Sequence, residues 1–184
     1  MTTADDAQHA HPGPTEHAVV VSRELDAPPD VAWTAWSDPD VLRRWWGPTG
    51  FTCPRADVDV RVGGSTVVTM QAPDAWGGFR IHNRWSFRVV QPPERLAFVS
   101  TFVDEAGTAL TPGEAGVPAT VPAEVPHVVL LEALPDGRTR LTLTETGYVD
   151  EETRAQSQAG QEQCLDKMQA IFAASRSGSD APLF

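Results

Sequence analysis

The sequence predicts one α+β domain, in which a curved antiparallel sheet packs on a long C-terminal helix. Apolar and polar residues alternate in several short segments, whereas the last part of the chain carries apolar residues at helical spacing. Strands that follow one another through short turns favour antiparallel pairing. The apolar face of such a sheet must be covered, and only the last helix is large enough. The expected order is strand, two helices, six strands and one helix, or β-α-α-β6-α.

The N-terminal part of the domain predicts one strand and two short helices. The segment AVVVSREL (18–25) is apolar and β-branched, which favours a strand. Pro28 and Pro29 can open a helix but not lie inside one, so a short helix is expected over 31–36. Asp38-Pro39 is a strong helix start, and this second helix should run through VLRRWW and stop at Gly47-Pro48.

The middle of the chain predicts six strands. They are RADVDVRV (55–62), STVVTM (65–70), IHNRWSFRVV (81–90), PPERLAFVSTF (92–102), HVVLLEAL (127–134) and TRLTLTET (139–146). Asp57, Asp59 and Arg61 are expected on a solvated face of the first of these. The long segment 103–126 is rich in Pro, Gly and Ala, and a loop of that size is usually functional or disordered.

A single long helix is expected to end the domain. Asp150 should cap it, and Glu151 and Glu152 suit the positive end of the helix dipole. Its apolar stripe consists of Ala159, Cys164, Leu165, Met168 and Phe172. We expect the domain to span 17–175, between a disordered N-terminal tail (1–16) and a flexible C-terminal tail (176–184).

Composition excludes several classes of function. A net charge of -11 argues against nucleic acid or an anionic membrane as a partner. No apolar run approaches the ~18 residues of a membrane span, and the N-terminus lacks the basic start and apolar centre of a secretory signal. Cys53 and Cys164 are not spaced as a metal knuckle or redox pair, so we expect free thiols in a cytoplasmic protein. His9 and His11 are interpreted as part of a loose tail.

Sharp catalytic or cofactor motifs are not found in the sequence. It has no Gly-rich phosphate loop, nucleophile elbow, zinc-helix motif or Cys-x-x-Cys, so no cofactor and no metal is predicted. A metal site from His82 and His127 is disfavoured because His82 falls on the opposite face, with Arg80 and Arg84.

Polar residues nevertheless occupy positions expected to face the apolar cup. Counting by two along each strand places His127 with Val129, Glu145 with Leu143, and Asn83 with Trp85. The same count places Arg23 inward, and Gln161 lies on the helix stripe. Two interpretations stay open: His127 and Glu145 form an acid–base or ligand-orienting pair, or Arg23 and Glu145 form a buried ion pair while His127 lies hydrogen-bonded near the sheet edge.

Several segments carry a family resemblance. They are APPDVAWTAWSDPDVLRRWWGP (27–48), DVRVGG (59–64), PPERLAF (92–98), TRLTLTETGY (139–148) and AGQEQCLDKM (159–168). In this order the chain resembles the START-like (SRPBCC) superfamily, and within it the Hsp90 ATPase activator homologue 1-like family. The resemblance covers 18–175 and implies the helix-grip (START/Bet v 1-like) fold with an internal cavity between sheet and C-terminal helix.

The resemblance also bears on three residues. It implies that one of Trp45 and Trp46 wedges the short helices onto the sheet while the other lies at the cavity rim; the alternative is that both are core packing. The family usually carries a large apolar residue, often Trp, after the helix glycine, whereas here Gln161 follows Gly160. Gly160 suggests a close approach or room for a ligand, and the Gln161 amide needs a partner in the protein, a ligand or water.

Three functions follow from this reading. The first is binding of a small apolar or aromatic ligand, with 103–126 as a possible lid and with lining by Arg23, Trp46, Met70, Asn83, Trp85, Phe98, His127, Glu145, Gln161 and Met168. The second is a cavity enzyme of cyclase, dehydratase or hydrolase type using His127 and Glu145, which the lack of a catalytic motif disfavours. The third is a role as a chaperone partner. It is not expected, because the eukaryotic relatives carry a separate N-terminal chaperone-binding domain, whereas only about 17 residues precede the first predicted strand here. A weak homodimer is compatible with all three.

Overall fold

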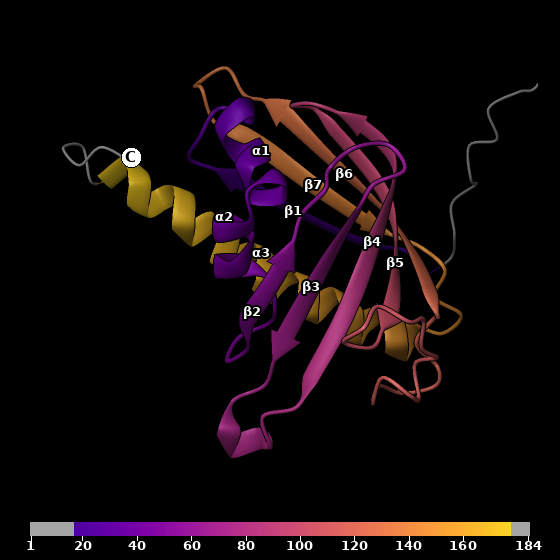
Figure 1. Ribbon diagram of the computed structural model, residues 1–184. Helices are drawn as coiled ribbons and strands as arrows, with labels where there is room; N and C mark the ends of the chain where they lie inside the picture. The colour runs from indigo at the N-terminus through magenta and orange to yellow at the C-terminus, as the bar shows by residue number, and fades with distance from the viewer. Residues whose placement is uncertain (1–16, 178–184) are drawn as a thin grey trace, which may run out of the picture.

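The computed structural model describes residues 17–177 and has the predicted element order. Figure 1 shows the elements, whose bounds are β1 (Val19–Leu25), α1 (Pro29–Ser37), α2 (Pro39–Trp45), β2 (Thr52–Asp57), β3 (Ser65–Gln71), the 3-10 turn η1 (Asp74–Trp76), β4 (Arg80–Gln91), β5 (Arg95–Val103), β6 (Glu124–Ala133), β7 (Thr139–Glu145) and α3 (Glu151–Ser177). Helix α3 runs two residues past the predicted domain end. The predicted tails, with His9 and His11, otherwise lie outside the described residues.

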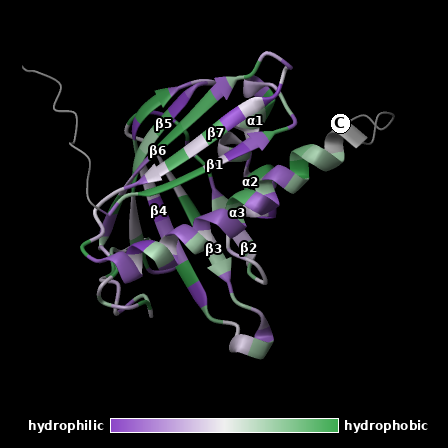
Figure 2. Cartoon of the chain, turned by 180° about the vertical axis from the view of Figure 1, so that it is seen from behind, coloured by the Kyte–Doolittle hydropathy of each residue, from purple (hydrophilic) through white to green (hydrophobic). Residues whose placement is uncertain are grey.

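The seven strands form one antiparallel sheet in the order β1-β7-β6-β5-β4-β3-β2. The sheet curls, α3 runs across its concave side, and α1 and α2 lie at one end of that side (Figure 1). The alternation of polar and apolar residues along the strands is visible in Figure 2. This is the predicted helix-grip fold. Across the described part of the chain, no helix combines the length and apolarity needed to cross a membrane.

Both predicted carboxylate caps, at the starts of α2 and α3, are confirmed. The Asp38 carboxylate accepts hydrogen bonds from the backbone amides of Asp40 (2.8 Å) and Val41 (3.3 Å) at the start of α2. The Asp150 carboxylate accepts one from the Thr153 amide (2.7 Å) at the start of α3. These caps fix where α2 and α3 begin, and the buried stripe of Cys164, Leu165, Met168 and Phe172 gives the face of α3 that meets the sheet.

The predicted strand over 55–62 is wrong over 58–62, and the strand begins at Thr52, three residues earlier than predicted. Strand β2 ends at Asp57, and 58–62 leave the ladder. The Arg61 amide donates to the Asp59 carbonyl oxygen (3.1 Å) in a tight turn, and a Cβ at Gly64 would come within 2.5 Å of that same oxygen. The alternating valines thus continue the pattern of a strand through a turn, and Val62 is exposed.

The adjacent tryptophans occupy two different environments. The Trp45 ring is fully buried, packs edge-to-face on Trp36 (4.9 Å between centroids), and its Nε1 donates to the Ala35 carbonyl oxygen (2.8 Å). Trp46 lies at the C-cap of α2, where the chain leaves the helix, and packs edge-to-face on Trp85 (4.8 Å). Trp45 therefore packs α2 against α1, whereas the Trp46 side chain packs on Trp85 of the sheet.

Candidate functional site

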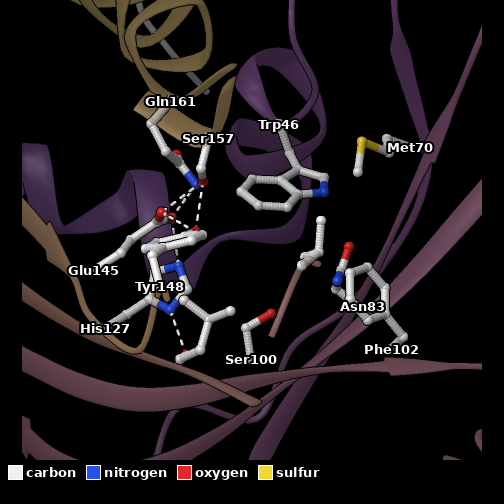
Figure 3. A pocket seen from close by; sticks show the side chains of 12 residues that line it. Trp46, Met70, Asn83, Ser100, Phe102, His127, Glu145, Tyr148, Ser157 and Gln161 are labelled. Carbon is white, nitrogen blue, oxygen red and sulfur yellow. Dashed lines mark hydrogen bonds and ion pairs between the residues drawn. The ribbon is translucent and has the colours of Figure 1, made fainter. Parts of the chain in front are cut away.

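A small hollow lies between the concave face of the sheet and the N-terminal half of α3 (Figure 3). This central hollow has a volume of about 130 Å³. It is lined by Trp46, Met70, Asn83, Ser100, Phe102, Val121, Val125, His127, Glu145, Tyr148, Ser157 and Gln161. A neighbouring side hollow of about 170 Å³ shares Trp46, Met70, Ser157 and Gln161 with it and is completed by Gly47, Pro48, Gly160 and Cys164.

The Glu145 carboxylate is the centre of the polar side of the central hollow (Figure 3). Its Oε1 lies 2.8 Å from His127 Nε2 and accepts a hydrogen bond from Gln161 Nε2 (2.6 Å). Its Oε2 lies 2.7 Å from both the Tyr148 and Ser157 hydroxyl oxygens, which are 2.6 Å apart. Four side chains from β6, α3 and the segment after β7 thus converge on one buried carboxylate.

The two nitrogens of His127 are both occupied by protein atoms. Its Nδ1 lies 2.8 Å from the Val125 carbonyl oxygen, which can only accept, so Nδ1 carries a hydrogen. Its Nε2 faces Glu145 Oε1 at a distance that requires a second proton between them. The ring also stacks on Phe98, with 4.6 Å between centroids. His127 is therefore held in one orientation by its strand, by Glu145 and by Phe98.

The surroundings of Glu145 favour its ionised form. Burial raises the pKa of this carboxyl, but the hydrogen bond and charge of His127, with the Tyr148 and Ser157 hydroxyls, outweigh burial and bring the pKa below its ordinary value. The pKa of Tyr148 is raised, first by burial and then by the nearby Glu145 charge, so its hydroxyl stays protonated. With one proton shared between His127 Nε2 and Glu145 Oε1, the two side chains together carry no net charge.

Three buried polar atoms of the lining have no hydrogen-bond partner in the structure. They are Trp46 Nε1, Asn83 Oδ1 and Gln161 Oε1, on side chains that are 7%, 6% and 8% exposed. Because only the NH2 group of Gln161 can donate to the Glu145 carboxylate, the network fixes the amide and leaves its oxygen unpaired. Trp36, Thr66 and Trp85 also carry unpartnered polar atoms, but none of these three residues lines either hollow.

Six predicted site residues line the central hollow and four do not. Those present are Trp46, Met70, Asn83, His127, Glu145 and Gln161. Trp85, Phe98 and Met168 are buried in the core behind this lining rather than in it. Trp85 and Phe98 stack on each other, with 5.0 Å between centroids. Trp46 packs on Trp85 and His127 packs on Phe98, so these two core rings support two residues of the lining.

Arg23 is the fourth residue, and its predicted ion pair with Glu145 is wrong. Arg23 Nε instead donates to Asp166 Oδ1 on α3 (2.8 Å), and the side chain is 24% exposed. β1 is an edge strand next to α3, so this long side chain passes the helix and keeps its charge in water. Glu145 pairs with His127, as the other sequence interpretation had it.

The prediction missed two polar residues that contact Glu145. Tyr148 follows the strand, beyond Gly147, whose φ of +100° turns the chain back toward the hollow. Ser157 precedes Gln161 by one helical turn, so the helical spacing could have identified it. Ser100, Phe102, Val121 and Val125 complete the missed lining.

Two further sequence interpretations concern histidine and the long loop. His82 Nδ1 bonds Thr69 Oγ1 (2.7 Å), and no cluster of metal-binding side chains occurs among the residues that the structure describes. The loop between β5 and β6 contributes Val121 to the lining, and the Thr120 hydroxyl lies 3.0 Å from that of Thr153 on α3. The loop therefore lies against one end of the central hollow.

Comparison with known proteins now identifies the family. The model of the family "Activator of Hsp90 ATPase homolog 1-like protein" matches residues 26–173. The chain belongs to this family. A search of curated proteins finds no match.

Solved structures of bacterial proteins have the same fold. The crystal structure of protein Ms6760 from Mycobacterium smegmatis is 25% identical, with a TM-score of 0.66, and the match covers 84% of this chain and 90% of that one. A solution structure of a protein from Arthrobacter aurescens is also 25% identical, with a TM-score of 0.68 and coverage of 86% and 87%. The AHSA1 protein from Silicibacter pomeroyi is 23% identical, with a TM-score of 0.68 and coverage of 86% and 99%, which shows the fold alone.

Proposed function

We propose that this protein binds a small apolar or aromatic molecule in the central hollow between the sheet and α3. The observation that supports this most is the set of three unpartnered polar atoms, on Trp46, Asn83 and Gln161, in the wall of a hollow that is otherwise largely apolar. A buried polar group without a partner costs about 1–3 kcal/mol. A ligand that supplies partners to these atoms recovers part of that cost on binding.

Catalysis by His127 and Glu145 is the alternative function, and the contacts favour binding over it. A general base needs a nitrogen or oxygen within hydrogen-bond reach of the substrate proton. In His127 one nitrogen is occupied by Val125 and the other by Glu145, and Glu145 in turn has four polar neighbours. The pair is better suited to orienting Gln161 than to moving a proton. A catalytic role would require His127→Ala to abolish turnover of a bound compound.

The family description raises chaperone activation as a third function. Our proposal places the activity in the internal hollow instead, where the unpartnered atoms are. The two functions separate in an ATPase assay with Hsp90: we expect no stimulation by this protein. Stimulation that persists when the hollow is filled by Gln161→Trp would favour the chaperone role.

We also propose a cytoplasmic location. Cys53 and Cys164 are both buried free thiols, which suits a reducing compartment. Fractionation of the source cells, followed by immunoblotting with cytoplasmic and periplasmic markers, tests this directly. Recovery with the periplasmic marker would contradict it.

A thermal-shift screen tests the binding proposal. Lipids, flavonoids, polyketides and single-ring aromatic compounds are compared at equal concentration, because a ligand that binds only the native state raises its melting temperature. Gln161→Trp fills the hollow and removes the unpaired oxygen, so it should abolish the shift. Gln156→Trp places the same side chain at an exposed position of α3 and should leave the shift intact. No shift with any compound would contradict the proposal.

A further inference from the structure

The lining of both hollows offers no free charge to a ligand. Glu145 and His127 neutralise each other as an ion pair, and the carboxylate already has four polar neighbours. Tyr148 stays protonated, and burial raises the pKa of Cys164 to about 12, so this side chain is neutral as well. A charged ligand would lose its water shell here without gaining a counter-ion, and burial of an unpaired charge is expensive.

The unpartnered atoms specify the polar groups that a ligand must carry. Gln161 Oε1 can only accept, so it requires a ligand donor, whereas Trp46 Nε1–H can only donate and requires a ligand acceptor. Asn83 Oδ1 is a further acceptor on the opposite side of the central hollow from Glu145 (Figure 3). Figure 3 shows the Trp46 nitrogen on the edge of the ring that faces Met70 and Asn83, away from Gln161, so an uncharged ligand must carry its donor and its acceptor at different positions to meet both.

The dimensions of the hollow restrict the ligand to about one ring. A 150 Å³ protein cavity is known to hold benzene, and the central hollow has about 130 Å³. Its apolar wall includes the Trp46 ring, the Phe102 ring and the Met70 thioether, which are surfaces that favour an aromatic ring. A lipid chain or a polycyclic compound would have to extend beyond the central hollow, for example into the side hollow of about 170 Å³.

We infer that the ligand is a neutral, single-ring aromatic molecule whose donor and acceptor pair with Gln161 Oε1 and Trp46 Nε1. This inference rests on the proposed function and names the ligand class of the same site. It assigns Glu145 a positioning role: by accepting from Gln161 Nε2, the carboxylate holds the amide with its oxygen toward the ligand. Glu145 is itself oriented by contacts of its carboxylate with His127, Tyr148 and Ser157, so these three residues affect the ligand only through Glu145.

Titration calorimetry with three matched probes tests this ligand class. Benzamide carries a neutral donor–acceptor group, benzoate has the same shape with a charge, and toluene has the ring without a polar group. We expect benzamide to bind about 10-fold more tightly than either of the others. Gln161→Met keeps the side-chain volume but removes the amide, so it should weaken benzamide binding about 10-fold and leave toluene binding unchanged.

Two more variants complete the design. Trp46→Phe removes the Nε1 donor, so it should weaken binding of 4-aminobenzamide, which carries a donor and an acceptor at opposite ends of the ring, more than binding of toluene. Gln156→Met, at an exposed position of the same helix, is the matched control and should bind all probes as the wild type does. Thermal unfolding of each variant establishes that the domain is folded before its affinity is compared.

The outcomes separate the inference from the proposed function. Equal affinity for toluene and benzamide, or tighter binding of benzoate, would overturn the polar, neutral ligand class while leaving a binding hollow. Binding of only the larger compounds of the thermal-shift panel would overturn the single-ring size. Failure of every compound in both experiments would overturn the proposed function itself.

Discussion

Replacing His127 with leucine removes the ionisable partner of a buried carboxylate. The His127–Glu145 contact is 2.8 Å long, and the two side chains are 5% and 2% exposed. Breaking a buried ion pair from one side costs about 3–5 kcal/mol. Since Glu145 keeps its contacts with Tyr148, Ser157 and Gln161, we expect the lower end, about 3 kcal/mol. At about 2–4 °C per kcal/mol, the melting temperature should fall by about 6–12 °C.

The double variant His127→Leu/Glu145→Leu isolates the interaction between the two residues. It removes both charges together, so its loss of stability should be smaller than the sum of the single losses by at least about 1 kcal/mol. Urea unfolding at pH 7, followed by tryptophan fluorescence and circular dichroism, gives the four free energies of the cycle. Arg23→Leu, which breaks the exposed pair with Asp166, is the matched control and should cost at most about 1 kcal/mol.

Additive single losses would refute this reasoning. So would a loss below about 1 kcal/mol for His127→Leu, because an unpaired buried carboxylate cannot cost so little. Either result would mean that the pair carries no charge in the folded protein, and that Gln161 is not held by an ionised Glu145.

Three further predictions concern acid stability, helix packing and thiol reactivity. Because Glu145 has a folded-state pKa below its ordinary value of 4.5, it stabilises the fold above that pH, and this stability should be lost as the pH falls below about 4.5. Acid titration of unfolding should show a smaller loss in His127→Leu; an identical loss would contradict the assignment. A Cβ at Gly160 would meet nothing within 4 Å, which rules out a close approach there, so Gly160→Ala should raise the unfolding free energy by up to about 1 kcal/mol in thermal denaturation. A clear destabilisation would show that this part of α3 needs the glycine. Burial raises the pKa of Cys53 and brings that of Cys164 to about 12, so neither thiol should react with iodoacetamide at pH 8 until the protein unfolds. Rapid labelling of the native protein, measured by mass spectrometry, would contradict the burial of both.

Local patterns in the sequence predict the fold almost completely. Asp38-Pro39 and Asp150 begin helices because a carboxylate cap acts within one turn, and alternation locates the strands because a half-buried strand repeats every two residues. The same locality explains the error over 58–62, where alternating valines pass through a turn that depends on contacts of Gly64.

The site was only partly predictable, because it depends on register and on contacts between distant segments. His127 and Glu145 are direct cross-strand neighbours in the β6–β7 hairpin, so counting back from the turn at Gly137 could have paired them. Arg23 shares their sheet face, yet nothing local indicates that it passes the edge of α3 to reach Asp166. Tyr148 depends on the left-handed turn at Gly147, which the strand pattern does not contain.

The roles of Trp45 and Trp46 also required the structure. Adjacent residues diverge, so the sequence indicates two environments without assigning them. The assignment follows from the end of α2: Trp45 is its last residue and packs inward, whereas Trp46 has already left the helix and lines the central hollow.

Native mass spectrometry tests most directly whether the central hollow binds a small molecule. The wild type and Gln161→Trp are prepared in parallel, and each is measured both freshly purified and after incubation with benzamide. We expect an added mass of one small molecule on the wild type, from the cell or from the benzamide, and no added mass on Gln161→Trp. An unliganded wild type under both conditions, or the same added mass on Gln161→Trp, would contradict binding in the central hollow.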